Sequence, residues 1–380
     1  MHLLDMTLFY APQSGGVKRY LTAKHAWLQG HAHVTHTLLV PGEINSPRRR
    51  SSVVTMRSPI LPFAQGYRLP VNLRDWRHAV RELKPDLIEA GDPYHLAWLA
   101  LREGQRLGVP TVGFYHSDLP RLLAARLGIT AERYAQAYVK QLYSHFDRVL
   151  APSRVLVERL HNLGVSNVHH QALGVDTRLF HPDLKDNSLR QRLGLPPATR
   201  LLIYAGRFSR EKNLPVLLKA MALVGREYHL LLVGGGHKLP AQANVTVWPY
   251  RADTQELARL IASCDALVHP GDLETFGLVV LEALACGLPV IGMAAGGVAE
   301  LVDATVGLLV PPRNPSALAE AISGLYQLDM HQLGLNARRK VEDHYSWDEI
   351  MPQLLGHYAG LLGTTERMPA VAIRDVHAAN

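Results

Sequence analysis

The sequence predicts an α/β protein of two domains, each built on a parallel sheet. The chain has 380 residues, more than one hydrophobic core usually serves. Short apolar segments alternate with helical segments of about ten or more residues, a pattern typical of parallel strand–helix–strand units. A polar stretch interrupts this series near residue 176, after which the alternation begins again.

The first series occupies residues 1–175. A strand over 3–7 leads through Gly15 and Gly16 into an amphipathic helix over 17–28. A strand, a glycine-bearing turn and a helix make a place where an anion can meet backbone amides, although a simple tight turn would have the same sequence. Further strands are expected over 34–40, 52–56, 86–90, 111–115 and 148–151, and further helices over 76–83, 95–107, 131–144 and 155–163.

The second series occupies residues 176–345, after a linker at 173–176. Strands are expected over 201–205, 229–233, 245–247, 266–269, 290–292 and 308–310, and helices over 215–223, 254–262 and 316–327, besides the central helix described below. A helical segment, 346–363, follows. The tail, 364–380, lacks a core-forming pattern and is expected to fray.

Composition sets the class of protein. Hydrophobic residues make up 47% and charged residues 19%, as in ordered globular proteins. No apolar run approaches the roughly 18 residues of a membrane span, and the N-terminus lacks the features of a signal peptide, so a cytoplasmic location is expected. The two cysteines, Cys264 and Cys286, lie in apolar runs and are expected to be reduced core thiols.

The rest of the chain is organised around residues 268–291. A helix is expected to begin near Phe276 and Gly277 and to end at Gly287, where its free N–H groups, including that of Leu278, favour a phosphate. Two carboxylates frame this position, Glu274 in the loop and Glu282 in the helix. The sequence around Glu282 is apolar, and a buried Glu seldom lacks a partner, which favours a role in ligand binding. The alternative is a solvated or ion-paired Glu282.

A second charged set follows the first strand of the second series. Gly206 and Arg207 end that strand and Lys212 comes shortly after it. Ligands of open parallel sheets bind at the carboxyl ends of strands, and an Arg fork with a Lys point charge suits a diphosphate. The alternative is a solvated, mixed-charge turn. The glycines at 234–236 lack the third glycine of a dinucleotide fingerprint and no GxxxxGK[ST] occurs, which disfavours nicotinamide, flavin and P-loop enzymes.

Together these motifs carry a family resemblance. The pattern GR(x)₃EKN at residues 206–213, ETFGLVVLE at 274–282 and GLPVIGMAAGG(x)₂EL at 287–301 resembles the retaining GT-B glycosyltransferases of family 4. The early GGVKRYL and the HSD at 116–118 agree with it. The resemblance covers nearly the whole chain and is strongest from 201 to 312. It implies two Rossmann-like domains that face each other across a cleft, with a last helix that crosses back to the first domain.

The resemblance also implies roles for individual residues. Arg207 and Lys212 would bind the donor diphosphate, Glu274 the sugar hydroxyls and Glu282 the nucleotide ribose, and His116 would lie next to the donor sugar. The remaining donor-binding residues by resemblance are Gly15, Gly16, Gly206, Tyr250, Arg251, Phe276, Gly277 and Leu278, with Tyr250 and Arg251 beside the base. In one departure, Gly271 stands where these enzymes often have a serine.

The implied reaction moves a hexosyl group from a GDP- or UDP-sugar to an acceptor hydroxyl with retained configuration. No second carboxylate is evident for a double displacement, so the departing diphosphate would accept the acceptor's proton. The motif set contains no DxD, and neither a metal nor another cofactor is expected. Two other functions fit the same architecture, a nucleotide-sugar 2-epimerase and a non-catalytic binding protein.

Charge is distributed unevenly along the chain. Residues 1–175 hold 21 Lys and Arg against 12 Asp and Glu, while residues 176–345 hold 17 of each. We therefore expect the first domain to dock peripherally on the inner, anionic face of the cell membrane and to glycosylate a lipid or lipid-linked saccharide, with no nucleic acid as partner. A merely solvated face, or one that steers nucleotide sugars and serves a soluble acceptor, would have the same composition. The basic residues concerned flank the apolar stretch 60–63 and are Arg48, Arg49, Arg50, Arg57, Arg68, Arg74 and Arg77.

Overall fold

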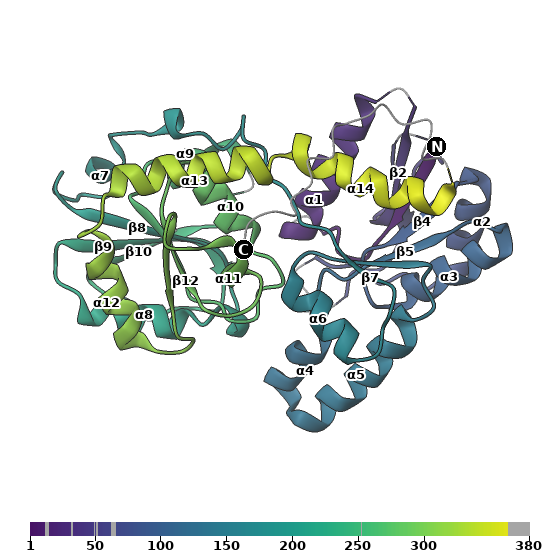
Figure 1. Ribbon diagram of the computed structural model, residues 1–380, viewed down its shortest axis with the longest axis horizontal. Coiled ribbons are helices and arrows are strands. Elements are labelled where there is room, and N and C mark those ends of the chain that lie inside the picture. The colour runs from purple at the N-terminus through teal and green to yellow at the C-terminus, as the bar shows by residue number, and fades with distance from the viewer. Residues whose placement is uncertain are drawn as a thin grey trace, which may run out of the picture.

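The computed structural model describes residues 1–11, 15–31, 33–48, 50, 52–61, 66–251 and 253–363. Two lobes lie side by side, the first half of the chain forming one and the second half the other (Figure 1). Each lobe has a parallel sheet with helices on both faces, as the alternating pattern predicted. The predicted tail, 364–380, lies outside the described residues, as do Arg49, Pro62 and Phe63 of the predicted docking face.

The first sheet has the order β3-β2-β1-β4-β5-β6-β7, and all its strand pairs are parallel. Its strands are β1 (His2–Met6), β2 (Thr35–Gly42), β3 (Val53–Arg57), β4 (Leu87–Ala90), β5 (Thr111–Phe114), β6 (Arg148–Ala151) and β7 (Val168–His170). The helices of this lobe are α1 (Gly16–Gln29), α2 (Leu73–Leu83), α3 (His95–Leu107), α4 (Leu119–Leu127), α5 (Ile129–Tyr143) and α6 (Arg154–Asn162).

The second sheet has the order β10-β9-β8-β11-β12-β13 and is also parallel throughout. Its strands are β8 (Arg200–Phe208), β9 (Tyr228–Gly236), β10 (Val245–Pro249), β11 (Ala266–His269), β12 (Val290–Met293) and β13 (Gly307–Val310). The helices after the first lobe are α7 (Leu189–Arg192), α8 (Leu214–Leu223), α9 (Thr254–Ala262), α10 (Leu278–Ala285), α11 (Val298–Leu301), α12 (Pro315–Leu325), α13 (Met330–His344) and α14 (Trp347–Leu362), with 3₁₀ turns η1 (Pro182–Leu184) and η2 (Arg210–Lys212).

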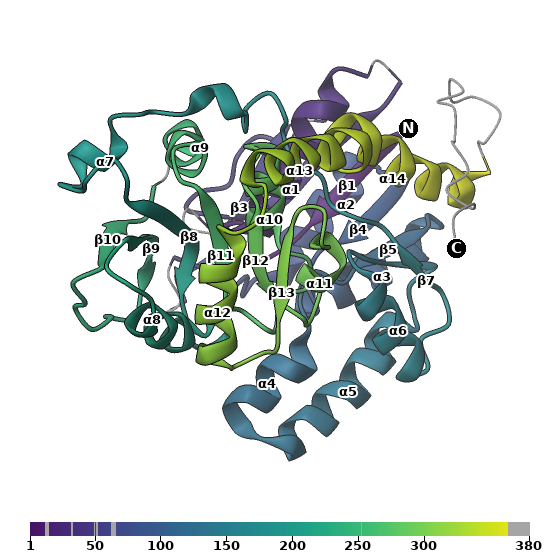
Figure 2. The same cartoon turned by 60° about the vertical axis from the view of Figure 1, so that its left-hand side comes forward.

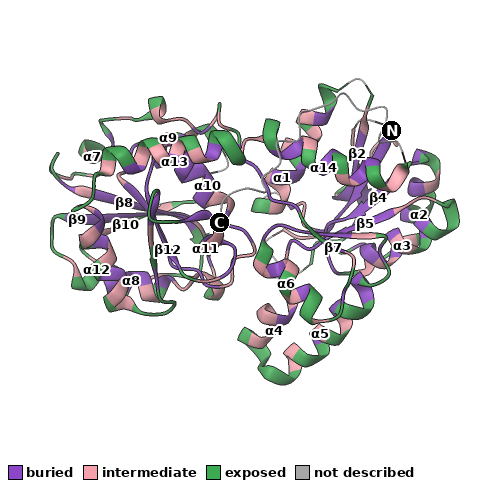
Figure 3. Cartoon of the chain, in the orientation of Figure 1, coloured by how far each residue is buried: buried purple, intermediate pink, exposed green. Residues whose placement is uncertain are grey.

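Both sheets have a topological switch point, where the order of strands reverses. In the first sheet it lies between β1 and β4, and in the second between β8 and β11. Ligands of such sheets bind in the crevice outside the carboxyl ends of the strands at this point. The loops that follow these strands therefore define where the site should lie. The central strands, such as β1, β4, β5 and β11, are buried because helices cover each sheet, whereas the edge strands β3, β7 and β10 are partly exposed (Figure 3).

The sequence-based prediction lacked the strand β7, the helices α4 and α13, the four-residue helices α7 and α11, and both 3₁₀ turns. The strand β7 is only three residues long and two of them are exposed, which hides its apolar pattern. Helices α4 and α13 begin with aspartate caps, since Asp118 accepts from Arg121 N (3.5 Å) and Asp329 from Gln332 N (3.0 Å). Asp followed by a helical segment is a known start signal, so both helices could have been found.

The last two helices cross the molecule. Figures 1 and 2 show α13 on the second lobe, followed directly by α14 on the first. Arg338 of α13 donates to Ala285 O at 2.7 Å, and in α14 the carbonyl of His357 accepts from Arg148 at 2.7 Å. The C-terminal helix therefore packs on the first domain, as expected. Among the described residues, no helix combines the length and apolar character needed to cross a membrane.

A buried ionic cluster fixes α14 on the first domain. Lys24 of α1 is fully buried, and its Nζ lies 2.8 Å from Asp5, 3.0 Å from Glu89 and 2.7 Å from the hydroxyl of Tyr358. Tyr358 also donates to Glu89. Burial disfavours the charge of Lys24, but the two carboxylates outweigh burial and raise its pKa. The cluster joins β1, β4, α1 and α14, and removing Lys24 would take away the cation that both buried carboxylates share.

Candidate active site

The predicted anion site lies where the loop after β11 leads into α10. Gly277 precedes α10 with φ of +107°, a left-handed conformation that favours glycine, and a Cβ there would lie 3.1 Å from Val298. No side chain caps the start of α10, and the helix runs from Leu278 to Ala285. Its first N–H groups are thus available to an anionic ligand, as the sequence predicted.

Glu274 lies in a charged cluster at this loop. It accepts from Lys212, and Nε2 of His269 lies 3.2 Å from its Oε1. The side chains of Lys212 and Glu274 are 20% and 16% exposed, so solvent screens their pairing only partly. Burial alone would raise the pKa of Glu274, but the charge of Lys212 and the hydrogen bond from His269 hold it well below its ordinary value. Glu274 is therefore ionised at neutral pH.

Glu282 is 3% exposed and joins the two domains. One carboxylate oxygen accepts from Arg19 of α1, while the other is buried and has no hydrogen-bond partner among the described residues. The charge of Glu282 raises the pKa of Arg19 despite burial, with a smaller contribution from Tyr250. Glu282 is therefore ion-paired, as in the alternative interpretation of the sequence, but the pair is buried and engages only one of its oxygens. The second oxygen is left to accept from a ligand hydroxyl.

His116 lies at the end of β5, on the first domain's side of the site. Its ring stacks on Phe114 at 4.0 Å, and its Nε2 is buried without a hydrogen-bond partner in the part of the chain described. Burial, with the charge of Lys24, lowers the pKa of His116 to about 3. The imidazole is therefore neutral at physiological pH. Its Nε2 can donate or accept a hydrogen bond with a ligand, depending on the tautomer, but the ring does not supply a positive charge.

Backbone contacts hold the first domain against the loop that carries Glu274. The hydroxyl of Thr275 donates to His116 O at 3.0 Å, and Ser153 donates to Thr275 O at 2.8 Å. A methyl group on Gly16 would lie 3.1 Å from the side chain of Leu278. The turn before α1 and the start of α10 are thus in close contact across the two domains, and any larger residue at 16 would press on α10.

The other predicted residues lie around this centre. Arg207 is exposed after Gly206 in β8, and Phe276 is buried beside Gly277. Tyr250 is 42% exposed, while Arg251 lies over the ring of Trp248 at 5.4 Å and pairs with Glu256 at 3.4 Å. Gly15 is half-buried ahead of α1. Within the described part of the chain, none of these side chains forms a hydrogen bond or an ion pair with Lys212 or Glu274, so their predicted roles depend on a ligand that spans the space between them.

Sequence reasoning missed two side chains of the centre, Arg19 and His269. Arg19 lies in the first turn of α1, within the motif GGVKRYL, and His269 ends a strand at the switch point. Two signals could have found them. Arg19 is part of the motif GGVKRYL, and His269 stands at the carboxyl end of a buried strand, where ligands of such sheets bind. The pairing of Arg19 with Glu282 could not be predicted from sequence, because the two residues are 263 positions apart in the chain.

Comparison with known proteins agrees with this architecture. Residues 14–179 match the family model Glycosyltransferase Family 4, and residues 185–340 match Glycosyl transferases group 1. The chain is 34% identical over 369 residues to a GDP-mannose-dependent alpha-mannosyltransferase of Mycobacterium tuberculosis, covering 93% of this chain and 95% of the relative.

A second relative and a solved structure extend the comparison. A GDP-mannose-dependent alpha-(1-6)-phosphatidylinositol dimannoside mannosyltransferase of Mycobacterium tuberculosis is 28% identical over 380 residues, covering 96% and 98% of the two chains. The structure of sucrose-phosphate synthase from Thermosynechococcus elongatus superposes with a TM-score of 0.77 at 24% identity, covering 96% and 99%, which shows the shared fold. The chain belongs to the GT-B glycosyltransferases of family 4.

Proposed function

We propose that this enzyme transfers a mannosyl group from GDP-mannose to a hydroxyl of a membrane lipid or lipid-linked saccharide, with retention of configuration. The observation that carries the proposal is the cluster of Lys212, Glu274 and His269. Thr275, next to Glu274, donates to the carbonyl of His116, so the loop of this cluster touches the first domain at that residue. The choice of GDP-mannose rests on the names of two relatives, which are GDP-mannose-dependent mannosyltransferases. UDP-hexoses are the donors to compare with it.

Each of these side chains is assigned to one part of the donor. The donor diphosphate would meet Lys212, Arg207 and the free N–H groups of α10, which stabilise charge as it leaves. Glu274, ionised beside Lys212, would accept from sugar hydroxyls, and the unpaired oxygen of Glu282 from the ribose. Neutral His116 has a free ring nitrogen for the sugar. Tyr250 and Arg251, after β10, are the candidates to hold the base.

The proposed transfer breaks one bond and forms another. The bond between the anomeric carbon and the diphosphate oxygen breaks, and the acceptor oxygen forms the new bond on the same face of the sugar. The acceptor's proton passes to the departing diphosphate oxygen. Lys212, Arg207 and the α10 amides neutralise the charge that a metal ion would otherwise meet, so we propose that the reaction needs no metal or other cofactor.

A donor screen tests this function. Purified enzyme is incubated with GDP-mannose, UDP-glucose or UDP-galactose and a lipid extract, and product anomers are assigned by NMR. We expect transfer from GDP-mannose, an α-linked product and unchanged rates in excess EDTA. An inverted product or abolition by EDTA with rescue by Mg²⁺ would refute retention or metal independence, respectively. A sugar epimerised without acceptor would favour the 2-epimerase instead, which the transferase relatives disfavour.

We further propose that the first domain docks on anionic membrane. Exposed apolar residues, Ile60 (57%), Leu61 (42%) and Val71 (71%), lie between β3 and α2, close in sequence to exposed Arg74 and Arg77. This combination suits lipid headgroups, where each basic residue contributes about 1 kcal/mol. Arg57, exposed at the end of β3, adds to this basic set.

Some arginines of the predicted docking face form ion pairs or hydrogen bonds within the chain, which leaves fewer arginines to contact a membrane. Arg48 pairs with Glu82 and Arg68 with Glu43, while Arg50 donates to the carbonyls of Leu83 and Lys84. These three side chains are partly neutralised or held within the chain. The proposed contact therefore depends chiefly on Arg57, Arg74 and Arg77 and on the exposed apolar residues beside them.

Co-sedimentation with liposomes tests docking. We expect binding to anionic vesicles at low salt, little binding to neutral ones, and release at high salt because screening shortens the reach of charge to about 3 Å at 1 M. Arg74→Glu/Arg77→Glu should abolish binding. The matched control is Lys219→Glu/Lys238→Glu, which changes two exposed charges on the second domain and should bind as wild type. Protein that stays in the supernatant with anionic vesicles at low salt would favour a soluble acceptor.

A further inference from the structure

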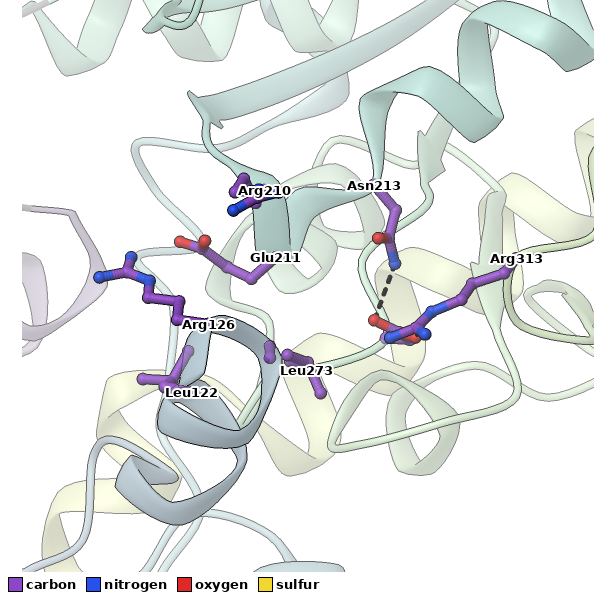
Figure 4. A pocket seen from close by; sticks show the side chains of 9 residues that line it. Leu122, Arg126, Arg210, Glu211, Asn213, Leu273 and Arg313 are labelled. Carbon is purple, nitrogen blue, oxygen red and sulfur yellow. Dashed lines mark hydrogen bonds and ion pairs between the residues drawn. The ribbon is translucent and has the colours of Figure 1, made fainter. Parts of the chain in front are cut away.

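A separate cavity lies beside the proposed reaction centre. Its volume is about 200 Å³, and α4 of the first domain forms one wall while η2 and the loop after β11 of the second domain form the others (Figure 4). Since a water molecule occupies about 30 Å³, the space accommodates several water-sized groups, such as a phosphate with part of a polyol. Leu122 and Leu273 supply an apolar part of the lining.

The polar lining contains two arginines with no ion-pair partner among the described residues. Arg126 comes from α4 and Arg210 from η2, and both are exposed. Arg313 differs, because its Nε lies 2.8 Å from Asp272, which also accepts from Asn213 at 2.7 Å. The positive charges of Arg126 and Arg210 are therefore the ones open to a ligand.

One carboxylate accompanies the two arginines. In Figure 4 the carboxylate of Glu211 lies between the side chains of Arg126 and Arg210. It accepts from Ser209 at 2.7 Å and keeps further lone pairs for a ligand hydroxyl. Arg126, Arg210 and Glu211 together carry a net positive charge. The arginines can bind an anion, and the carboxylate can accept from a hydroxyl of the same ligand.

The cavity is continuous in sequence with the reaction centre. Arg210 and Glu211 immediately precede Lys212, and Asp272 and Leu273 immediately precede Glu274. Successive Cα atoms are only about 3.8 Å apart, so a molecule in the cavity lies beside the backbone that carries the Lys212–Glu274 pair. Because α4 belongs to the first domain, the cavity is on the side from which an acceptor would approach.

We propose that this cavity binds the phosphate-bearing headgroup of the acceptor, a phosphorylated polyol or saccharide. Arg126 and Arg210 hold the phosphate from opposite domains, since the planar guanidinium matches its oxygens, and Glu211 accepts from a neighbouring hydroxyl. This assignment rests on the proposed transferase function and specifies its acceptor class. A ligand held by both arginines would also favour closure of the two domains over the donor.

The test uses three acceptor probes and GDP-mannose. They are glycerophosphoinositol, phosphatidylinositol in neutral phosphatidylcholine vesicles, and uncharged myo-inositol. The inositol headgroup is chosen because one relative is named a phosphatidylinositol dimannoside mannosyltransferase. Arg126→Gln/Arg210→Gln should raise KM about tenfold to a hundredfold for both phosphate-bearing probes, because charge-assisted contacts are lost. It should leave KM for myo-inositol and the affinity for GDP unchanged. Inorganic phosphate should compete with glycerophosphoinositol in wild type.

Two controls make the outcome decisive. Arg133→Gln removes an exposed charge from neighbouring α5 and should behave as wild type. Calorimetric titration with glycerophosphoinositol in the presence of GDP measures binding of this probe without turnover. In Arg126→Gln/Arg210→Gln the heat of binding should disappear. If wild type binds this probe through the arginines yet transfers nothing, the site stands and the transferase function fails. Wild-type protein that does not bind it, or an equal loss with myo-inositol, overturns the headgroup site.

Discussion

Replacing Lys212 by methionine removes a charge but keeps an unbranched side chain of similar length. Lys212 and Glu274 are largely buried, so the contact of Lys212 with a bound diphosphate should be only partly screened. A charge-assisted hydrogen bond contributes roughly 1.5–3 kcal/mol, and each 1.4 kcal/mol is about tenfold in affinity. We therefore expect Lys212→Met to weaken GDP binding by about tenfold to a hundredfold.

Calorimetric titration with GDP and with GMP checks this prediction. GMP lacks the second phosphate, so the substitution should weaken GMP binding by less than about threefold, as expected for a weak, screened contact. Lys219→Met is the matched control, because Lys219 is exposed on α8 of the same domain and its loss removes an equal charge. Equal losses for GDP and GMP in Lys212→Met would refute the assignment of Lys212 to the diphosphate.

The same substitution should change the pH dependence of stability. Folding lowers the pKa of Glu274 below 4.5, so this carboxylate stabilises the fold above pH 4.5 and that contribution is lost as pH falls toward the folded pKa. Without Lys212 the pKa rises, and at pH 7 we expect a loss of about 2 kcal/mol from the weakened pairing. The difference in unfolding free energy between wild type and variant should shrink as pH falls below 4.5. A difference that stays constant from pH 7 to pH 3.5 would contradict this coupling.

Three further predictions follow from the site and its support. Glu274→Gln should remove most transfer activity while shifting Tm by only a few degrees, since volume is conserved; near wild-type turnover with unchanged melting would exclude contact with the reacting sugar. His116 has a folded pKa of about 3 against an ordinary 6.5, so it stabilises the fold above pH 6.5 and this contribution declines below it. His116→Asn should therefore flatten the fall in stability between pH 6.5 and 4.5, measured by urea unfolding, and an unchanged slope would show that His116 titrates normally. Tyr358→Phe should cost about 1–3 kcal/mol of stability by leaving Glu89 and Lys24 short of a buried partner, and a variant as stable as wild type by denaturant titration would mean that water replaces the hydroxyl.

The local sequence was enough for the elements that carry the site. A glycine followed by an apolar run predicted α10 and its uncapped N-terminus, because glycine readily adopts the positive φ that Gly277 has before the helix. The alternation of apolar strands and helices specified two parallel sheets. The motif spacing then gave Glu274, Glu282, Arg207 and Lys212 as candidate donor-binding residues, which remain predictions until ligand binding is measured.

Pairing between distant segments was decided only by the tertiary structure. Arg19 reaches Glu282 across the domain boundary, and Tyr358 reaches Lys24 and Glu89 from the far end of the chain. Sequence periodicity reports which face of an element is buried, but not which other element covers it. The cavity lined by Arg126 and Arg210 arises in the same way, because the position of α4 against η2 depends on how the two domains pack. The charge of the first domain was visible in the sequence, whereas the engagement of Arg48, Arg50 and Arg68 within the chain required their neighbours in space.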